Sequence, residues 1–314
     1  MTAKTMRRQA LRPQSIASKP VRVDPAFADP EAVLELVRNL GPYPSVGTYT
    51  NGGTPDPETA SMPWYLVEPD SDLLVQNPNW VTAAKKAFDS EIVEPIRCVV
   101  NLNPPAPINA PHLDLPVYRG FSVPEIPTSF LMTMSNSGLF VDWLVPLASG
   151  IAWFWQGEGG EFEYWPEGPD GASVVERPPL WNVGVISDNE AMWHRVRAIG
   201  PAARATQRYE TVPGASQMHW AGDCWEIRDA GSTLARFAPS EVRISFVWKG
   251  YVFKDEAHYR SFEDRSYDLT MDQVIDIFQD DLAKRGKRPP RPSDALNDRE
   301  WRALLDHVYT PLQA

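Results

Sequence analysis

The sequence predicts a mainly β protein with flanking α-helices, in which a β-sandwich or barrel core lies between helical segments. Short runs rich in β-branched and aromatic residues, bounded by proline, glycine and asparagine, fill residues 96–253. Apolar residues at helical spacing precede and follow that region. With 314 residues, of which 43% are hydrophobic, the chain is long enough for a large core.

Two helices are expected before the β-rich region. Asp29 and Pro30 form a cap and first-turn pair, and apolar residues then recur at helical spacing until Gly41. After a loop rich in proline, glycine and threonine, a second amphipathic helix carries Trp80 and Phe88. We expect both helices to buttress a sheet.

The middle of the chain is expected to contain eight short strands separated by turn residues. The glycine-rich segment between Gln156 and Glu161 predicts a hairpin turn. The predicted strands are Ile96–Leu102, His112–Tyr118, Ser129–Met134, Ile151–Gln156, Glu161–Trp165, Trp181–Ile186, Met192–Ile199 and Glu241–Phe253.

The last sixty residues return to a helical pattern. Thr270 and Gln273 form a capping box, and Gly286 ends the helix that follows it. Another helix is expected to begin near Asn297 and to bury Trp301.

These elements predict a disordered basic tail at residues 1–22 and a single domain at residues 23–314. The tail could also be read as an organelle transit peptide, but no apolar helical stripe accompanies its charges. The chain has no apolar run of 18 residues, so we expect a cytoplasmic protein. The domain divides into helical residues 23–94, a β-core at 95–253 with an insertion at about 201–240, and C-terminal helices at 254–314.

The net charge of the chain limits the classes of molecule that it is expected to bind. A net charge of -11 and a pI near 5.0 argue against a protein that grips nucleic-acid phosphates. A small-molecule substrate fits better, with no membrane partner, and the oligomeric state stays open.

The strongest chemical signal is a His-x-Asp pair. On a strand, His112 and Asp114 would point to the same face, and His194 lies in an apolar strand pattern that could bring a third ligand. Two histidines and one carboxylate on one face of an iron ion leave three coordination positions open. The alternative is that His112 and Asp114 are a hydrogen-bonded loop pair after Pro111.

Further motifs follow this pair in a recognisable order. From about Arg97 to Phe253 the chain resembles the double-stranded β-helix core, a jelly-roll or cupin-like fold, of the iron(II)/2-oxoglutarate-dependent oxygenases. The matching segments are Pro111-His112-Leu113-Asp114, Gly159-Gly160-Glu161-Phe162, Glu167-Gly168-Pro169-Asp170-Gly171, Trp193-His194-Arg195-Val196 and Arg243-Ile244-Ser245.

The resemblance implies that iron(II) is held by His112, Asp114 and His194, with 2-oxoglutarate and O2 as co-substrates. It also implies an arginine and a hydroxyl that hold the distal carboxylate of 2-oxoglutarate. Arg243 and Ser245 share one face of an alternating strand, and a guanidinium can bind a carboxylate through two hydrogen bonds.

The spacing of the anchoring arginine departs from the family pattern. Arg204 and Thr206 stand at the usual distance from the distal histidine and are the fallback pair, whereas Arg243 lies much later. With Arg243 as the anchor, residues 201–240 become an insertion with a hairpin turned at Asp229-Ala230-Gly231, and that insertion could act as a lid.

The resemblance implies a dioxygenase that converts 2-oxoglutarate to succinate while it oxidises an unactivated C–H bond of a small organic molecule. Related halogenases have a small residue in place of the carboxylate, so the resemblance implies that Asp114 favours hydroxylation, desaturation or another oxidative rearrangement, of which hydroxylation is the main expectation. Tyr118, Trp153 and Trp155 are candidate substrate contacts. Two alternatives remain, a cupin-type metalloenzyme without 2-oxoglutarate and a non-catalytic β-sandwich binding module.

Overall fold

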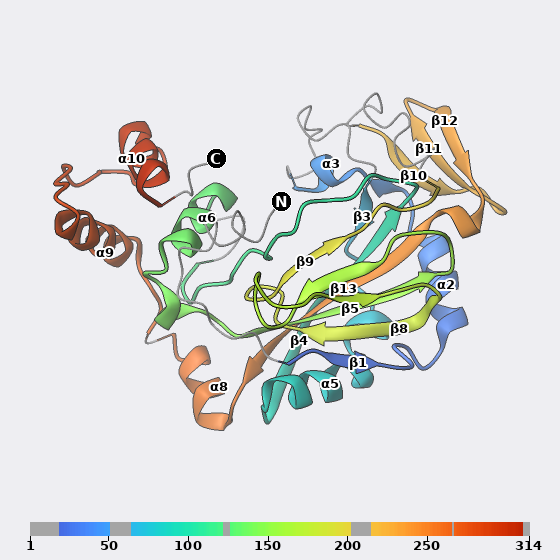
Figure 1. Ribbon diagram of the computed structural model, residues 1–314, viewed down its shortest axis with the longest axis horizontal. Coiled ribbons are helices and arrows are strands. Elements are labelled where there is room, and N and C mark those ends of the chain that lie inside the picture. Colours follow the sequence, from blue (N-terminus) through green and yellow to red (C-terminus); the bar gives the residue numbers. More distant parts are fainter. Residues whose placement is uncertain (1–18, 51–63, 122–125, 202–214, 266, 310–314) are drawn as a thin grey trace.

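The computed structural model describes residues 19–50, 64–121, 126–201, 215–265 and 267–309. A six-stranded sheet in the order β1-β8-β5-β13-β4-β3 forms its centre, and all the neighbouring strands in it are antiparallel (Figure 1). We name it the major sheet. Its strands are β1 (Val21–Val23), β3 (Tyr65–Val67), β4 (Ile92–Asn103), β5 (Leu147–Trp155), β8 (Leu180–Ser187) and β13 (Arg243–Phe253).

A three-stranded minor sheet has the order β7-β6-β9 and is extended by an isolated bridge between His112 and His194. Its strands are β6 (Phe162–Trp165), β7 (Val174–Glu176) and β9 (Trp193–Val196). Along the sequence the chain passes repeatedly from the major sheet to the minor sheet and back. Antiparallel strands that alternate between two facing sheets define the predicted double-stranded β-helix.

The interior between the two sheets is largely aromatic and aliphatic. Trp153 and Val185 from the major sheet pack in one cluster with Phe162 and Met192 from the minor sheet and the turn before β9. Side chains of a strand alternate between its faces, so every second residue of β13 points into this interior. The inward residues of β13 are Arg243, Ser245, Val247 and Lys249, whereas Ile244, Phe246 and Trp248 belong to the outer core.

Helices cover the outer face of the major sheet, as the sequence predicts. The Asp29 side chain caps α2 (Pro30–Asn39) by accepting a hydrogen bond from the backbone N–H of Ala32. In α5 (Pro78–Phe88), Trp80 is fully buried and stacks on Trp248. Two shorter helices, α3 (Val46–Thr50) and α4 (Asp72–Val75), also belong to the N-terminal part of the sequence. No described helix is both long and apolar enough to cross a membrane.

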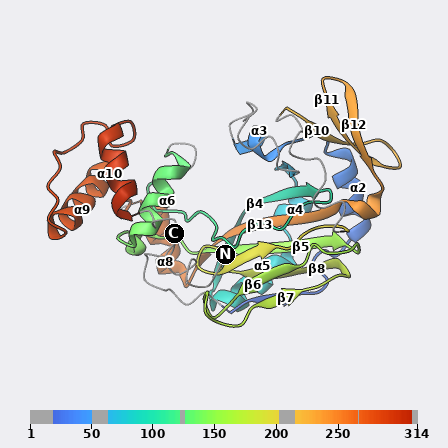
Figure 2. The same cartoon turned by 45° about the horizontal axis from the view of Figure 1, so that its top comes forward.

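A separate helical cluster lies at one end of the sheets (Figures 1 and 2). The predicted capping box of Thr270 and Gln273 begins α9, and Trp301 is buried in α10. The cluster is built mainly from α6 (Thr128–Ser137), α9 (Met271–Lys284) and α10 (Arg299–Tyr309), while α8 (Glu256–Glu263) follows β13 directly.

The described part of the predicted insertion forms a small sheet together with β2 at the other end (Figure 2). The predicted hairpin is confirmed, because β11 and β12 pair antiparallel around Ala230 and Gly231, which both have positive φ angles. The sheet has the order β12-β11-β10-β2, with β2 (Tyr43–Pro44), β10 (Gln217–Trp220), β11 (Trp225–Asp229) and β12 (Ser232–Phe237).

Four local predictions are wrong. Residues Ser129–Met134 lie in helix α6 rather than in a strand, because Phe130, Leu131 and Met134 fall on one helical face that packs into the helical cluster. Residues 112–118 do not form a continuous strand and make only single bridges at His112 and Tyr118.

The third wrong prediction is the hairpin turn between Gln156 and Glu161. The strands β5 and β6 do not pair with each other, so this segment carries the chain from the major sheet to the minor sheet. Gly159 and Gly160 both have positive φ angles, which allow the sharp change of direction. Most of the predicted basic tail, at residues 1–18, lies outside the described residues, and its predicted end is wrong because Val21 and Arg22 pair with β8 as part of β1.

Candidate metal centre

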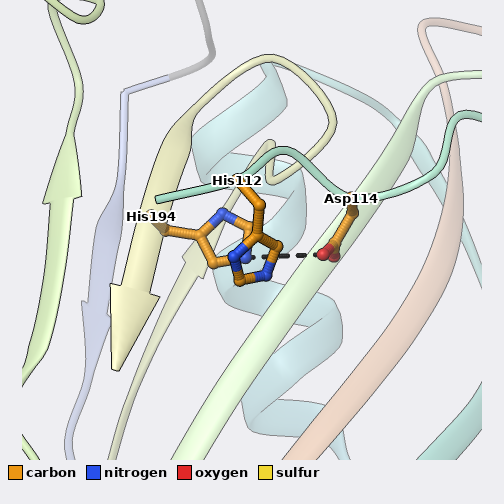
Figure 3. Close-up of side chains that lie close together, drawn as sticks. All are labelled: His112, Asp114 and His194. Carbon is orange, nitrogen blue, oxygen red and sulfur yellow. Dashed lines mark ion pairs between the residues drawn. The ribbon is translucent and has the colours of Figure 1, made fainter. Parts of the chain in front are cut away.

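His112, Asp114 and His194 converge on one point, as Figure 3 shows. One possible ligand atom from each side chain lies within 4.8 Å of those of the other two. His194 is buried, Asp114 is half-buried and His112 is exposed, so the cluster opens to solvent on the His112 side. Two imidazole nitrogens and a carboxylate oxygen form a donor set that suits a divalent first-row metal ion.

Backbone pairing brings the two histidines together. His112 and His194 exchange both of their backbone N–H···O=C hydrogen bonds, each of 3.0 Å, and their ring centroids lie 4.4 Å apart. The Nδ1 atom of His112 contacts the Ala110 carbonyl at 3.1 Å, and that of His194 contacts the Met192 carbonyl at 3.0 Å. A protonated Nδ1 that donates to a carbonyl leaves Nε2 free for a metal. Both rings are therefore oriented as ligands.

An ion-pair network on the other face of the minor sheet fixes strand β9, which carries His194. The buried Glu163 carboxylate of β6 accepts hydrogen bonds from Arg195, Arg197 and Ser173. The hydrogen bond from Arg197 is the main reason that the pKa of Glu163 falls to about 2. The register of β9 against β6 is thus held by charge as well as by backbone pairing.

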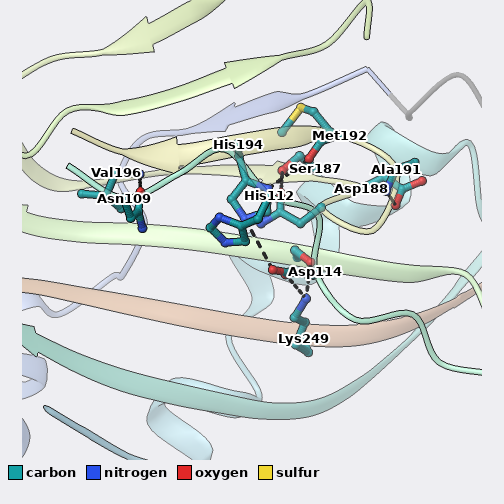
Figure 4. Close-up of polar contacts among 12 residues, drawn as sticks. Asn109, His112, Asp114, Ser187, Asp188, Ala191, Met192, His194, Val196 and Lys249 are labelled. Carbon is teal, nitrogen blue, oxygen red and sulfur yellow. Dashed lines mark hydrogen bonds and ion pairs between the residues drawn. The ribbon is translucent and has the colours of Figure 1, made fainter. Parts of the chain in front are cut away.

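Asp114 has a cationic neighbour, Lys249, which projects from the inward face of β13 (Figure 4). The Lys249 Nζ atom donates to Asp114 Oδ2 at 2.7 Å and to Ser149 Oγ at 2.6 Å. The other oxygen, Asp114 Oδ1, lies 3.4 Å from His194 Nε2. Burial would raise the pKa of Asp114, but the charge of Lys249 and the contact with His194 hold it well below its usual range.

The backbone also holds Asp114 in place. Its N–H donates to the Asn189 carbonyl at 2.9 Å, and the Asn189 side chain accepts a hydrogen bond from Ser187 at 2.7 Å. Asn189 and Ser187 are fully buried. These contacts replace the strand pairing that the sequence predicts for this segment.

Arg243 is a second cation in the interior and is only 2% exposed. Its Nε donates to the Gly160 carbonyl at 3.0 Å, but the buried Nη2 atom has no hydrogen-bond partner. No carboxylate of the described residues forms an ion pair with this guanidinium. Burial therefore lowers its pKa to about 9.

The glycine turn after β5 packs closely against this guanidinium. A Cβ atom on Gly160 would lie 3.0 Å from Arg243 Cδ and 2.9 Å from Trp155 Nε1. The Trp155 indole donates to the Gly159 carbonyl at 2.8 Å. The Gly159-Gly160 motif of the sequence thus forms one wall around Arg243.

The other predicted site residues are placed as follows. Ser245 is buried on the same face of β13 as Arg243 and lies opposite Trp153 in the strand register. Trp153 and Trp155 are buried between the two sheets, and the Trp153 Nε1 atom has no partner. Tyr118 lies in the helical cluster, with its ring against Phe140, and is not part of the metal cluster.

The fallback pair Arg204 and Thr206 lies outside the described residues. A polar cavity of about 500 Å³ lies on the insertion sheet, and none of the predicted site residues lines it. The role of the insertion as a lid stays a prediction.

Lys249 contacts the candidate site and was not predicted from the sequence. The signal was present, because Lys249 follows Arg243 and Ser245 in the same alternating pattern of an otherwise apolar strand. An ionisable residue at an inward strand position needs a buried partner. That partner is the carboxylate of the His-x-Asp pair.

No family model matches this chain, and no curated protein matches it. Similar solved structures include a 2OG-Fe(II) oxygenase family protein from Burkholderia pseudomallei, with 14% identity, coverage of 80% of this chain and 90% of that one, and a TM-score of 0.39. HygX from Streptomyces hygroscopicus, with nickel, 2-oxoglutarate and hygromycin B bound, has 10% identity, coverage of 75% and 83%, and a TM-score of 0.38. A prolyl hydroxylase from Trichoplax adhaerens, in complex with a hypoxia inducible factor peptide, has 10% identity, coverage of 82% and 94%, and a TM-score of 0.36.

The printed description of one of these similar structures is a 2OG-Fe(II) oxygenase family protein. Their identities of 14% or less and TM-scores below 0.5 are too low to transfer a function. The chemistry must follow from the residues of this chain.

Proposed function

We propose that this protein is an iron(II)- and 2-oxoglutarate-dependent oxygenase that hydroxylates an unactivated C–H bond of a small organic molecule. His112, Asp114 and His194 would hold the iron, and Arg243 with Ser245 would bind the distal carboxylate of 2-oxoglutarate. The donor set fits iron(II), because two imidazoles and one carboxylate on one side of the ion leave positions open for a chelating co-substrate and O2.

The observation that carries this proposal is the unpaired guanidinium of Arg243 in the same interior as the histidine–carboxylate cluster. A buried cation without a counterion is costly, and a bound anion would remove that cost. The His112, Asp114 and His194 cluster lies farther along the same inward face, beside Lys249 of β13, so an anion with a second polar end could bind Arg243 and a metal ion together. A keto acid with a distal carboxylate has these two ends.

The residues of the interior have distinct tasks. The guanidinium of Arg243 orients the distal carboxylate through charge-assisted hydrogen bonds, and the hydroxyl of Ser245 can add one more. The aromatic and aliphatic walls of the interior exclude water from the reacting atoms. Bound iron would let O2 oxidise 2-oxoglutarate to succinate and carbon dioxide, with one oxygen atom entering succinate and the other entering the hydroxylated substrate. The exposed side of His112 is where a substrate would enter.

Succinate formation tests the reaction class. Purified protein given iron(II), ascorbate and 2-oxoglutarate should form succinate slowly even without its substrate, and His112→Ala and His194→Ala should not. Each histidine variant should also lose metal affinity by more than the roughly 10- to 100-fold typical of an outer partner. His219→Ala is the matched control, because His219 lies on the insertion sheet.

Two other outcomes correspond to the alternatives. Tight binding of one divalent ion without any succinate would favour a cupin-type metalloenzyme that does not use 2-oxoglutarate. Absence of a tight divalent-ion site would favour a non-catalytic β-sandwich binding module.

A further inference from the structure

Lys249 is a buried ammonium in direct contact with a residue of the metal cluster. It is 7% exposed, and its two polar partners are Asp114 Oδ2 at 2.7 Å and Ser149 Oγ at 2.6 Å. Ser149 lies opposite Lys249 in the pairing of β5 with β13, so the sheet itself fixes the position of this contact. Figure 4 shows the ammonium on the side of Asp114 away from the two imidazole rings.

The two oxygens of Asp114 therefore have different surroundings. Oδ1 faces His194 Nε2 at 3.4 Å, whereas Oδ2 is occupied by the ammonium. A divalent ion beside the two imidazoles can reach Oδ1, but Oδ2 already carries a positive charge that would repel the ion. We propose that Lys249 is a positioning residue that restricts Asp114 to coordination through one oxygen and so keeps the adjacent metal position open.

This inference rests on the proposed metal site and explains how its open positions are kept. A carboxylate that binds through both oxygens occupies one coordination position more than a carboxylate that binds through one. A chelating co-substrate and O2 together need three open positions. Lys249 thus protects the position that a second oxygen of Asp114 would take.

The effect of removing Lys249 has a predictable sign. Lys249→Met keeps much of the side-chain length, frees Asp114 Oδ2 and removes a positive charge next to the ion. Divalent-ion affinity should then rise by about tenfold, because a repulsive charge is lost and a second oxygen is gained. A purely structural lysine would give the opposite result, since loss of an outer partner usually weakens binding by roughly 10- to 100-fold.

Cobalt(II) is a suitable probe, because its visible absorption spectrum reports the number and geometry of its ligands. The wild type, Lys249→Met and Lys249→Arg are titrated with cobalt(II) without 2-oxoglutarate, and thermal unfolding is followed with and without the ion. We expect Lys249→Met to show a changed cobalt spectrum, tighter binding and a larger thermal stabilisation by the ion than the wild type. Lys249→Arg keeps the charge and should give the wild-type spectrum.

Ser149→Ala is the matched control, since it removes the other partner of Lys249 and leaves Asp114 paired. If Lys249→Met does not fold, Lys249→Gln is measured in its place and should show the same changes to a smaller degree. An unchanged cobalt spectrum and unchanged or weaker affinity in the folded variant would overturn the role of Lys249. Absence of cobalt binding by the wild type would instead overturn the proposed metal site.

Discussion

The inward face of strand β13 carries two buried cations, which differ in whether a counterion is present. Lys249 has a carboxylate at 2.7 Å and a hydroxyl at 2.6 Å, whereas Arg243 has one carbonyl and an unpaired Nη2. Both side chains are more than nine-tenths buried. Burial alone therefore does not separate a structural charge from a binding site, but the presence or absence of a counterion does.

The difference has an energetic meaning. A buried ion pair is satisfied within the protein, and breaking it leaves an uncompensated charge. An unpaired buried cation already lowers the stability of the ligand-free protein and recovers this cost when an anion binds. We infer that Lys249 positions Asp114 in the candidate metal site and that Arg243 binds an anionic ligand.

Replacing each cation by methionine tests this comparison and should give the largest effect. Lys249→Met leaves Asp114 without its cation and should lower the free energy of unfolding of the metal-free protein by about 2 to 3 kcal/mol. Arg243→Met removes an unpaired charge and should raise that free energy by about 1 to 2 kcal/mol, even though the hydrogen bond to Gly160 is lost. Urea unfolding at pH 7 without metal and without organic anions measures both. Two changes of the same sign would mean that the two cations are equivalent.

A fully paired buried charge elsewhere sharpens the comparison. The pKa of Glu163 is about 2, below its ordinary value of 4.5, mainly because Arg197 donates a hydrogen bond to the carboxylate. Burial opposes this shift, and the hydrogen bonds from Arg195 and Ser173 add to it. Because the folded pKa is the lower one, this group stabilises the protein above pH 4.5 and loses that contribution as the pH falls toward 2. Glu163→Gln should cost about 2 kcal/mol at pH 7, and the difference from the wild type should shrink between pH 4.5 and pH 2. A difference that is independent of pH would show that the ion pairs contribute nothing.

The smallest expected effect concerns the wall around Arg243. Gly160→Ala places a Cβ atom 3.0 Å from Arg243 Cδ at a φ of +71°, so the guanidinium must shift. We expect about a tenfold loss of 2-oxoglutarate affinity, or roughly 1.4 kcal/mol, with unchanged metal affinity. Gly168→Ala is the matched control, because Gly168 has a φ of +84° and no atom within 4 Å of the added Cβ. Equal losses in both variants would assign the effect to backbone strain alone.

The sequence predicted the features that depend on local pattern. The alternation of β13, the caps of α2 and α9 and the hairpin at Ala230 and Gly231 follow from short-range periodicity and turn chemistry, and the structure contains all of them. The convergence of the three metal-site residues required an assumption about which distant strands pair. The bridge between His112 and His194 supplies that pairing.

The features that the sequence did not predict depend on long-range packing. The composition of Ser129–Met134 is compatible with a strand or a helix. The helix is favoured because its apolar face packs against α9 and α10. The turn at Gly159 and Gly160 has the composition of a hairpin, but its strands belong to different sheets. Lys249 could be placed inward by alternation, but its partner lies 135 residues away in the sequence.

The most direct test of the central claim is the anaerobic addition of 2-oxoglutarate to the iron(II)-loaded protein. A keto-acid chelate of iron(II) gives a weak visible charge-transfer band, and its growth measures 2-oxoglutarate binding without knowledge of the substrate. The wild type should give the band, and Arg243→Ala should need roughly a hundredfold more 2-oxoglutarate for the same band while its iron affinity is unchanged. The increase in the 2-oxoglutarate concentration needed by Ser245→Ala should be much smaller than for Arg243→Ala, corresponding to about 1 kcal/mol. Arg204→Ala should behave as the wild type. A missing band in the iron-loaded wild type, or a large loss in Arg204→Ala with none in Arg243→Ala, would contradict the account.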